Sequence, residues 1–529
     1  MKAYISPLIY LLFSFIGFAQ IPDGNAIKFA QNISAADAKK HLSILASDEY
    51  EGRETGKEGQ KKAAAYIAAY FKSIGLETAT DESYLQKFPL MQSTSENFNM
   101  SVGNKKFDLY QDYYVFPYGN PLKYKTKNIL FLGYGISDEK YDDYKNVDVK
   151  DKILLVLDGE PLTQDSISLI TGTKKSSPWK KNTRMKLEAA RKNGAAAIFI
   201  ISEKFEEDAN HIKHLFDSPV IKLETTETKV ERKIFRGGIS LKAANDILSF
   251  AKHKGGTQME TVENIQKKII QTKAPVSLSI KMHFSMEIKN TIEKISSENV
   301  LGIIKGSELP NEYVFISAHY DHIGVIDGKV YNGADDDGSG TVGMMEIAKS
   351  FIKAKEAGMA PKRTIVFLAN AGEEKGLLGS SYYVEHPLFP LENTVCDLNI
   401  DMIGRGDEAH QSDSNFVYII GSDKISTDLH KINELCNSAY THMQLDYTYN
   451  NENDPNRFYY RSDHYNFARK GIPIIFYFNG THADYHQEGD EVSKINFPLL
   501  VKRAQLTFYT AWEIANRKER IKIDVILNK

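Results

Sequence analysis

The stretch between residues 313 and 340 constrains the fold more than any other part of the sequence. An apolar run over residues 313–316 leads into His319, and three adjacent aspartates follow at 335–337 between glycines. The run predicts a buried strand, and the glycine-rich loop predicts the start of a helix. Adjacent carboxylates repel one another unless a cation lies between them, and a neighbouring histidine favours zinc or another transition metal. For the triplet by itself, an acidic solvated loop is the alternative.

Length and composition exclude several classes of protein. The chain has 529 residues, which at roughly 100–200 residues per domain predicts two to four domains. Apolar residues make up 42% and charged residues 26% of the sequence, as in a globular protein. The net charge is −3 without a basic stripe, so nucleic acid is not expected as a partner. The two cysteines, Cys396 and Cys436, do not form a disulfide framework.

The N-terminus has the pattern of a secretory signal peptide. Lys2 is followed by a mostly apolar stretch over residues 4–18 that ends in small residues. We expect residues 1–19 to be removed after Ala19 and the protein to be periplasmic or secreted. An uncleaved anchor is the alternative, but the stretch is shorter than the roughly 20 residues of a membrane span. Stable membrane insertion is therefore not expected.

Two regions with different sequence patterns follow. Residues 123–275 contain apolar strand-like runs at 129–132, 153–157 and 198–201, but no cluster of histidine and acidic residues. We expect a separate β-rich domain that acts as a lid or structural insert, with ligand binding as the weaker alternative. From residue 298 onward, strand patterns alternate with helix patterns, which is typical of an α/β layer fold.

The chemical residues of the second region recur where its predicted strands end. These strands are residues 300–304, 313–318, 364–370, 396–403, 416–420 and 472–478. At or beyond their ends stand His319, the aspartates 335–337, Glu373, Glu374, Asp401 and His486. Ligands of α/β sheets bind at the carboxyl ends of strands. Five ligands with one bridging carboxylate fit two metal ions, which can activate a water between them, and a carboxylate left unbound can act as general base.

These motifs resemble peptidase family M28, the co-catalytic zinc aminopeptidases and related carboxypeptidases. The resemblance rests on His319-Tyr320-Asp321, residues 333–340, 373–380 and 401–405, Ser462-Asp463-His464 and Tyr485-His486. It implies an α/β fold, a zinc-exopeptidase-like three-layer sandwich with a mixed central sheet. Residues 20–122 and 276–529 would form the peptidase domain. Residues 123–275 resemble, more weakly, an inserted protease-associated (PA) domain.

The resemblance also assigns two zinc ions per chain and their ligands. His319 and Asp401 would bind one zinc, Glu374 and His486 the other, and Asp336 would bridge both. A cis peptide bond would follow the bridging aspartate.

Other roles follow from the same resemblance. Glu373 would be the general base, Asp321 would orient the imidazole of His319, and Tyr459 would contact the reaction intermediate. The histidines without an assigned role are His322, His464 and His482. We expect His464 to support the site, and the other two to lie around it or on the surface.

The leading hypothesis is an aminopeptidase acting on peptides, because the motif loops carry a surplus of acids that favours a substrate ammonium. A carboxypeptidase on the same scaffold is the close alternative, since Arg405, Arg457 or Arg461 could bind a substrate carboxylate. Glutaminyl cyclase uses one zinc, and a non-catalytic receptor would have lost ligands, so the complete ligand set disfavours both. The oligomeric state is not predicted.

Overall fold

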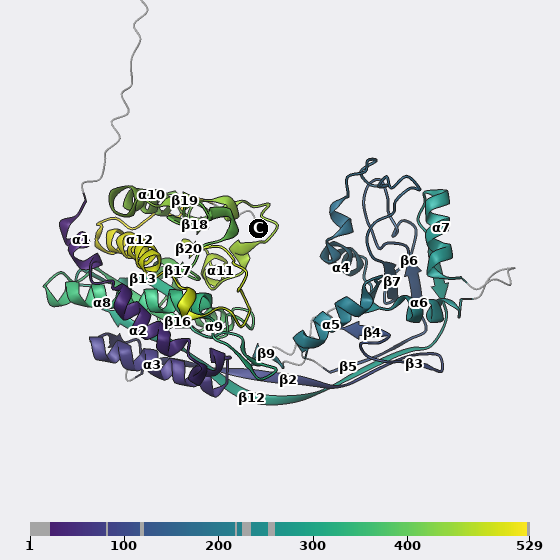
Figure 1. The fold of residues 1–529 in the computed structure, drawn as a ribbon, viewed down its shortest axis with the longest axis horizontal. Helices are drawn as coiled ribbons and strands as arrows, with labels where there is room; N and C mark the ends of the chain where they lie inside the picture. Colours follow the sequence, from purple (N-terminus) through teal and green to yellow (C-terminus); the bar gives the residue numbers. More distant parts are fainter. Residues whose placement is uncertain are drawn as a thin grey trace, which may run out of the picture. The chain divides into compact units, whose positions relative to one another are not determined.

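The computed structural model describes residues 22–80, 83–116, 121–216, 219–224, 234–251 and 260–525. The predicted signal peptide lies outside these ranges. The chain divides into two compact units (Figure 1). Unit 1 comprises Met1–Pro89 and Ser296–Lys529, and unit 2 comprises Leu90–Ile295.

Unit 1 is built on a mixed sheet in the order β19-β18-β20-β17-β13-β16-β12. Strand β13 pairs in parallel with both β16 and β17, and β17 pairs in parallel with β20. Strands β12 and β18 run antiparallel to their neighbours β16 and β20. Two strands belong to both units by their residue ranges, β2 (Leu85–Val102) and β12 (Phe284–Ile304). The other strands of unit 1 are β1 (Glu77–Thr78), β13 (Leu309–His319), β14 (Gly324–Ile326), β15 (Lys329–Tyr331), β16 (Arg363–Asn370), β17 (Thr394–Ile400), β18 (Phe416–Ile420), β19 (Gln444–Asp446) and β20 (Ile474–Phe478).

Helices cover both faces of this sheet. On β16, Phe367 packs against Phe351 of α8, with ring centroids 6.4 Å apart. Its neighbours Val366 and Leu368 point to the opposite face and share a core with helices α9 and α11. This alternation follows from the two-residue period of a strand. The predicted three-layer α/β sandwich is therefore confirmed. The helices are α1 (Gly24–Ala30), α2 (Ala35–Leu45), α3 (Glu58–Ile74), α8 (Gly340–Glu356), α9 (Leu378–Glu385), α10 (Thr427–Cys436), α11 (His464–Ala468) and α12 (Phe497–Asn516).

The predicted elements differ from the observed ones mainly at their ends. Strand β17 ends at Ile400, so Asp401 lies just beyond it rather than inside a strand reaching residue 403. Strand β12 is much longer than the predicted 300–304. Phe284, Met286 and Ile288 are buried at alternate positions and residues 289–295 are mostly exposed, so this part carries no continuous apolar run. The short β19 has no sequence signal of its own.

Unit 2 has its own sheet, in the order β11-β6-β7-β8-β10-β4. Strands β6, β7, β8 and β10 are parallel, and buried aliphatic and aromatic side chains line them. The elements of this unit are β3 (Lys105–Phe107), β4 (Tyr113–Val115), β5 (Leu122–Thr126), β6 (Ile129–Leu132), β7 (Ile153–Leu157), β8 (Ala197–Ile201), β9 (Val220–Leu223), β10 (Phe235–Ile239), β11 (Ser277–Ile280), α4 (Thr183–Lys192), α5 (Phe205–Phe216), α6 (Leu241–Leu248) and α7 (Val262–Thr272).

The assignment of residues 123–275 to a PA-like domain stays a prediction. Within the described part of the chain, no helix combines the length and apolar character needed to cross a membrane.

Candidate metal centre

The parallel strands of unit 1 bring the predicted ligands to one edge of the sheet. His319 is the last residue of β13, and Asp401 follows directly after β17. Glu374 stands in the loop after β16, and His486 in the loop after β20. Asp336 comes from the turn that opens α8. Because the carboxyl ends of parallel strands meet at the same edge, residues far apart in the sequence converge there.

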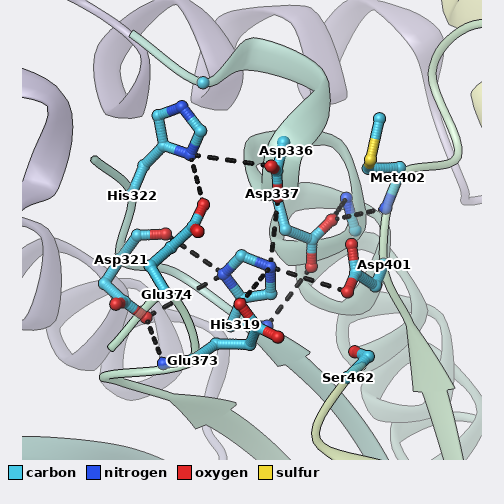
Figure 2. A network of polar contacts seen from close by, with 12 residues as sticks. His319, Asp321, His322, Asp336, Asp337, Glu373, Glu374, Asp401, Met402 and Ser462 are labelled. Carbon is cyan, nitrogen blue, oxygen red and sulfur yellow. Dashed lines mark hydrogen bonds and ion pairs between the residues drawn. The ribbon is translucent and has the colours of Figure 1, made fainter. Parts of the chain in front are cut away.

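Asp336 lies between two histidines and presents a different oxygen to each. Its Oδ1 is 3.3 Å from His319 Nε2, and its Oδ2 is 3.1 Å from His486 Nε2. His319 Nε2 is also 3.7 Å from Asp401 Oδ2, and His486 Nε2 is 3.2 Å from Glu374 Oε2 (Figure 2 shows the first group). The five predicted ligands thus form two groups that share Asp336, which is the arrangement that a bridging carboxylate requires.

Several of these buried atoms lack a hydrogen-bond partner. They include His319 Nε2, Asp336 Oδ2 and Glu374 Oε1. An unsatisfied buried polar group costs about 1–3 kcal/mol. Histidine nitrogen and carboxylate oxygen are ligands of zinc, so two zinc ions would satisfy these atoms, and the residues present fit the metals that the resemblance implies.

Asp337 also lies close to His319 and Asp401, but its oxygens are already occupied. Its Oδ1 accepts hydrogen bonds from the backbone N–H groups of Gly340 and Met402, and its Oδ2 accepts one from His319 N–H. Asp336 is therefore the better ligand of the pair. The peptide bond between Asp336 and Asp337 is cis, which confirms the expectation from the resemblance.

Opposite charges dominate the site when no metal is bound. Burial alone would lower the pKa of His486, but the carboxylates of Asp336 and Glu374 raise it to about 10. Burial alone would raise the pKa of Glu374, but His322 and His486 bring it down to about 2. His486 therefore holds a proton when no metal is bound, and a metal cation would replace that proton.

Glu373 faces the same centre without being needed as a ligand. Its Oε2 is 3.9 Å from His319 Nε2, and burial raises the pKa of its carboxyl well above the usual range. The N–H of Glu373 donates to Asp321 Oδ1 over 3.2 Å, and Thr55 donates to the other oxygen over 2.6 Å. The Asp321 carboxylate thus supports the glutamate loop.

The orientation of His319 rests more on the backbone than expected. His319 Nδ1 is 3.1 Å from the carbonyl oxygen of Asp321 and 3.9 Å from its Oδ1. A donated Nδ1–H leaves Nε2 free to face the metal position.

Two residues that the sequence did not single out for this role hold the aspartate turn. The buried guanidinium of Arg53 donates to the carbonyl oxygens of Tyr320, Asn332 and Gly333. Asp490 accepts from the N–H groups of Asp335 and Asp336. Their side chains act on backbone atoms distant in sequence, so no local pattern marks them.

The centre opens into a pocket lined by both charged and apolar side chains. It is lined by Asp336, Glu373, Asp401, Met402, Phe458, Arg461, Phe476, Phe478 and Tyr485. Arg461 Nη2 donates to the hydroxyl of Tyr485 over 3.1 Å. Arg405 is instead paired with Asp484 at 3.0 Å, and Arg457 stacks on Tyr460.

Tyr459 is not among the lining residues of this pocket, and its hydroxyl is buried without a hydrogen-bond partner. Its role as a contact of the intermediate stays a prediction. His464 Nε2 donates to the Tyr459 carbonyl oxygen over 2.9 Å, and the ring stacks on Phe476 of the pocket lining. His482 Nε2 lies 3.2 Å from Asp335 Oδ2. His322 is fully buried beside Glu374 rather than on the surface.

Residues 299–511 match the model described as peptidase family M28. A probable glutamate carboxypeptidase of Arabidopsis thaliana is 38% identical over 116 residues, 22% of this chain and 16% of that protein. A probable zinc metalloprotease of Pyrenophora teres f. teres is 27% identical over 275 residues, 44% of this chain and 56% of that protein. The mouse aminopeptidase NAALADL1 is 35% identical over 119 residues, 22% of this chain and 15% of that protein. The chain thus spans about half the length of one of these relatives and about a sixth of the other two.

Two solved structures share the fold over nearly the whole chain. An aminopeptidase from Aneurinibacillus sp. strain AM-1 superposes with a TM-score of 0.56 and 17% identity, covering 95% of this chain and 98% of that one. The zinc aminopeptidase BSAP of Bacillus subtilis gives a TM-score of 0.51 and 19% identity, covering 93% and 99%.

Proposed function

We propose that this chain, whose residues 299–511 match the model of peptidase family M28, is an exported zinc aminopeptidase of that family with two zinc ions. The observation that carries the proposal is Asp336, which faces His319 with one carboxylate oxygen and His486 with the other. His319 and Asp401 complete one site, and Glu374 and His486 the other. The apolar N-terminal stretch supports export to the periplasm or the medium.

Bound zinc supplies a Lewis acid that polarises the scissile carbonyl and acidifies water. The chain itself supplies the proton transfers. Glu373 takes the proton of the attacking water on its carboxylate and delivers it to the nitrogen of the departing amine. The arrangement of Glu373 on the loop fixed by Asp321 supports its alignment.

A developing oxyanion needs hydrogen-bond donors that line the pocket. Tyr485 and Arg461 meet this condition, because both line the pocket with the carboxylates of the metal centre. The Tyr485 hydroxyl accepts from Arg461, which leaves its own proton to donate. Tyr459 keeps its predicted role only if its buried hydroxyl is reached by substrate.

The carboxylates of the pocket favour a peptide with a free N-terminus. Glu373 and Asp401 line it beside Asp336, and their negative charge attracts a substrate ammonium. Arg461 is the specific observation in favour of the second candidate, a carboxypeptidase, because its guanidinium lines the same pocket and could hold a terminal carboxylate.

Peptide panels distinguish the two candidates. The zinc-loaded protein would be assayed on one peptide in free, N-acetylated and C-amidated forms. An aminopeptidase loses most cleavage on acetylation and little on amidation, whereas a carboxypeptidase shows the reverse. Cleavage of both blocked forms at internal bonds would contradict an exopeptidase altogether.

Two arginine variants provide the matched control. Arg461→Met should raise KM strongly only if the substrate carboxylate binds there. Arg457→Met, whose guanidinium stacks on Tyr460 instead of lining the pocket, should leave KM unchanged in either case.

A further inference from the structure

His322 is a buried histidine at the metal centre to which neither the resemblance nor the function above gives a role. Its side chain has no exposed surface. Its Nδ1 lies 2.9 Å from Glu374 Oε1 and 3.9 Å from Asp336 Oδ2 (Figure 2). The ring centroid of His486 is 5.9 Å away. His322 therefore faces the same point as the other side chains of one predicted zinc site.

The contact with Glu374 is close, yet it is not a hydrogen bond by direction. Neither ring nitrogen of His322 has a partner of acceptable hydrogen-bond geometry, and Glu374 Oε1 has none either. A donating N–H points along its bond to the acceptor, and the interaction weakens steeply at poor angles. His322 Nδ1 and Glu374 Oε1 lie close together without the alignment of a hydrogen bond. Two ligands of the same metal ion have this arrangement, because each points at the ion and not at the other.

We propose that His322 is a fourth protein ligand of the zinc held by Asp336, Glu374 and His486. The inference rests on the two-zinc site proposed above. Around a tetrahedral zinc with bonds of about 2.0–2.2 Å, neighbouring ligand atoms lie about 3.4 Å apart. Both histidines face Asp336 Oδ2, at 3.9 Å from His322 and 3.1 Å from His486. Glu374 presents Oε1 to His322 at 2.9 Å and Oε2 to His486 at 3.2 Å, so all four contacts scatter around this separation.

The surrounding chain holds the ring of His322 in this place. The backbone N–H of His322 donates to the Arg53 carbonyl oxygen over 3.3 Å, and His322 forms an isolated β-bridge with Glu54. Gly333 leaves room for the imidazole, because a Cβ there would lie 2.4 Å from His322 Cδ2. Arg53 Nη2 also donates to the Gly333 carbonyl oxygen over 2.9 Å. The two residues that position the imidazole are therefore bonded to each other.

The fourth ligand makes the two zinc sites unequal. Four protein ligands close a tetrahedral site, as in structural zinc centres, whereas three ligands leave a position open. The site of His319, Asp401 and Asp336 keeps its open position. The site that includes His322 therefore binds the first zinc, and the open site binds the second.

A crystal structure of the zinc-loaded protein, with the ions located by their anomalous scattering, tests the proposal directly. The expected distance from His322 Nδ1 to the ion beside His486 is about 2.0–2.1 Å. Two bound ions with His322 Nδ1 beyond bonding distance would overturn the inference and leave the proposed function intact. A protein that binds no zinc would overturn the proposed function itself.

Competition titrations with a zinc chelator measure the same effect in solution. Removal of a residue that merely orients a ligand costs about 10–100-fold in metal affinity. His322→Asn should weaken the first zinc by more than this and leave the second nearly unchanged. His482→Asn is the control, since its Nε2 faces Asp335 rather than the predicted ligands, and should change neither. An affinity for the first zinc that His322→Asn leaves unchanged would contradict the proposal.

Discussion

In each unit a polar side chain reaches the carboxyl end of a parallel strand, but Lys186 of unit 2 and His319 of unit 1 are satisfied in opposite ways. In unit 2, the buried Lys186 Nζ donates to the carbonyl oxygens of Leu157 and Gly159 at 2.6 and 2.8 Å, directly after β7. In unit 1, His319 Nε2 at the end of β13 has no hydrogen-bond partner.

This difference in hydrogen bonding distinguishes a buried charge with a structural role, Lys186, from a side chain available as a metal ligand, His319. A buried polar group with good partners stabilises its surroundings, whereas one without them costs about 1–3 kcal/mol. Glu160 of unit 2 likewise accepts from Ser168 Oγ and Ser177 N–H. Buried polar atoms without hydrogen-bond partners are present at the predicted metal centre, where a cation can offset their cost.

The largest effect is expected for Asp336→Ala. Both ions depend on this carboxylate, so the variant should lose both zincs and all activity. Elemental analysis after gel filtration measures the loss. Asp143→Asn is the control from unit 2, because the Asp143 carboxylate accepts from Tyr134 and Ile136 N–H groups and faces no predicted ligand. If Asp336→Ala kept both zincs, the bridging role would be wrong.

Glu373→Gln should keep both zincs and lose about 10²–10⁴-fold in turnover, since the amide preserves shape but cannot accept the proton. Glu374→Gln should instead lose zinc from the site of His486. Turnover numbers and zinc content, measured on the same samples, separate the two outcomes. Unchanged turnover in Glu373→Gln would assign the base to another group.

Zinc affinity should rise with pH. In the metal-free protein, burial opposes a charge on His486, but Asp336 and Glu374 raise its pKa to about 10. The imidazole is therefore protonated at neutral pH, and zinc must displace that proton, so affinity falls as pH decreases. The expected slope is roughly tenfold per pH unit for each proton displaced. Chelator competition between about pH 6 and 8 measures it, and a flat profile would contradict the protonated metal-free site.

The smallest effect is expected for Lys186→Met, which should lower the free energy of unfolding by about 1–3 kcal/mol because two carbonyls lose their donor. Burial lowers the pKa of Lys186 from 10.5 to about 8. The unfolded chain therefore holds more protons between these values, so this lysine makes the wild type gain stability as pH rises through that window.

The loss in Lys186→Met should grow over the same window. Denaturant unfolding measures it, with the exposed Lys192→Met on the same helix as control. If Lys186→Met left the free energy of unfolding unchanged, the hydrogen-bonded Lys186 would contribute nothing to stability. The comparison between Lys186 and His319 would then fail on the side of unit 2.

Much of the fold and site followed from short-range patterns. Apolar runs marked the strands of unit 1, and His319 and Asp401 stand at the ends of two of them. The paired glutamates after β16 were equally visible. The patterns did not reveal the length of β12, because a strand with a polar, exposed face lacks an apolar run.

Side-chain direction was less predictable than position. The expected role of the Asp321 carboxylate is carried in part by its backbone carbonyl, which lies closer to His319 Nδ1. Arg461 and Tyr485 line the pocket, whereas Tyr459 does not. A loop sequence indicates which side chains lie near a strand end, but it does not indicate the direction in which each side chain points.

By itself, the sequence determined the kinds of ligand and their order along the chain, since residue type and strand pattern are local properties. Only the tertiary structure decided that each oxygen of Asp336 faces a different histidine and that His322 is turned inward beside Glu374. The physical reason is that these orientations depend on packing between distant segments. The Arg53 guanidinium, which donates to the carbonyl oxygens of Tyr320 and Gly333 ahead of the aspartate turn, is the clearest of these long-range contacts.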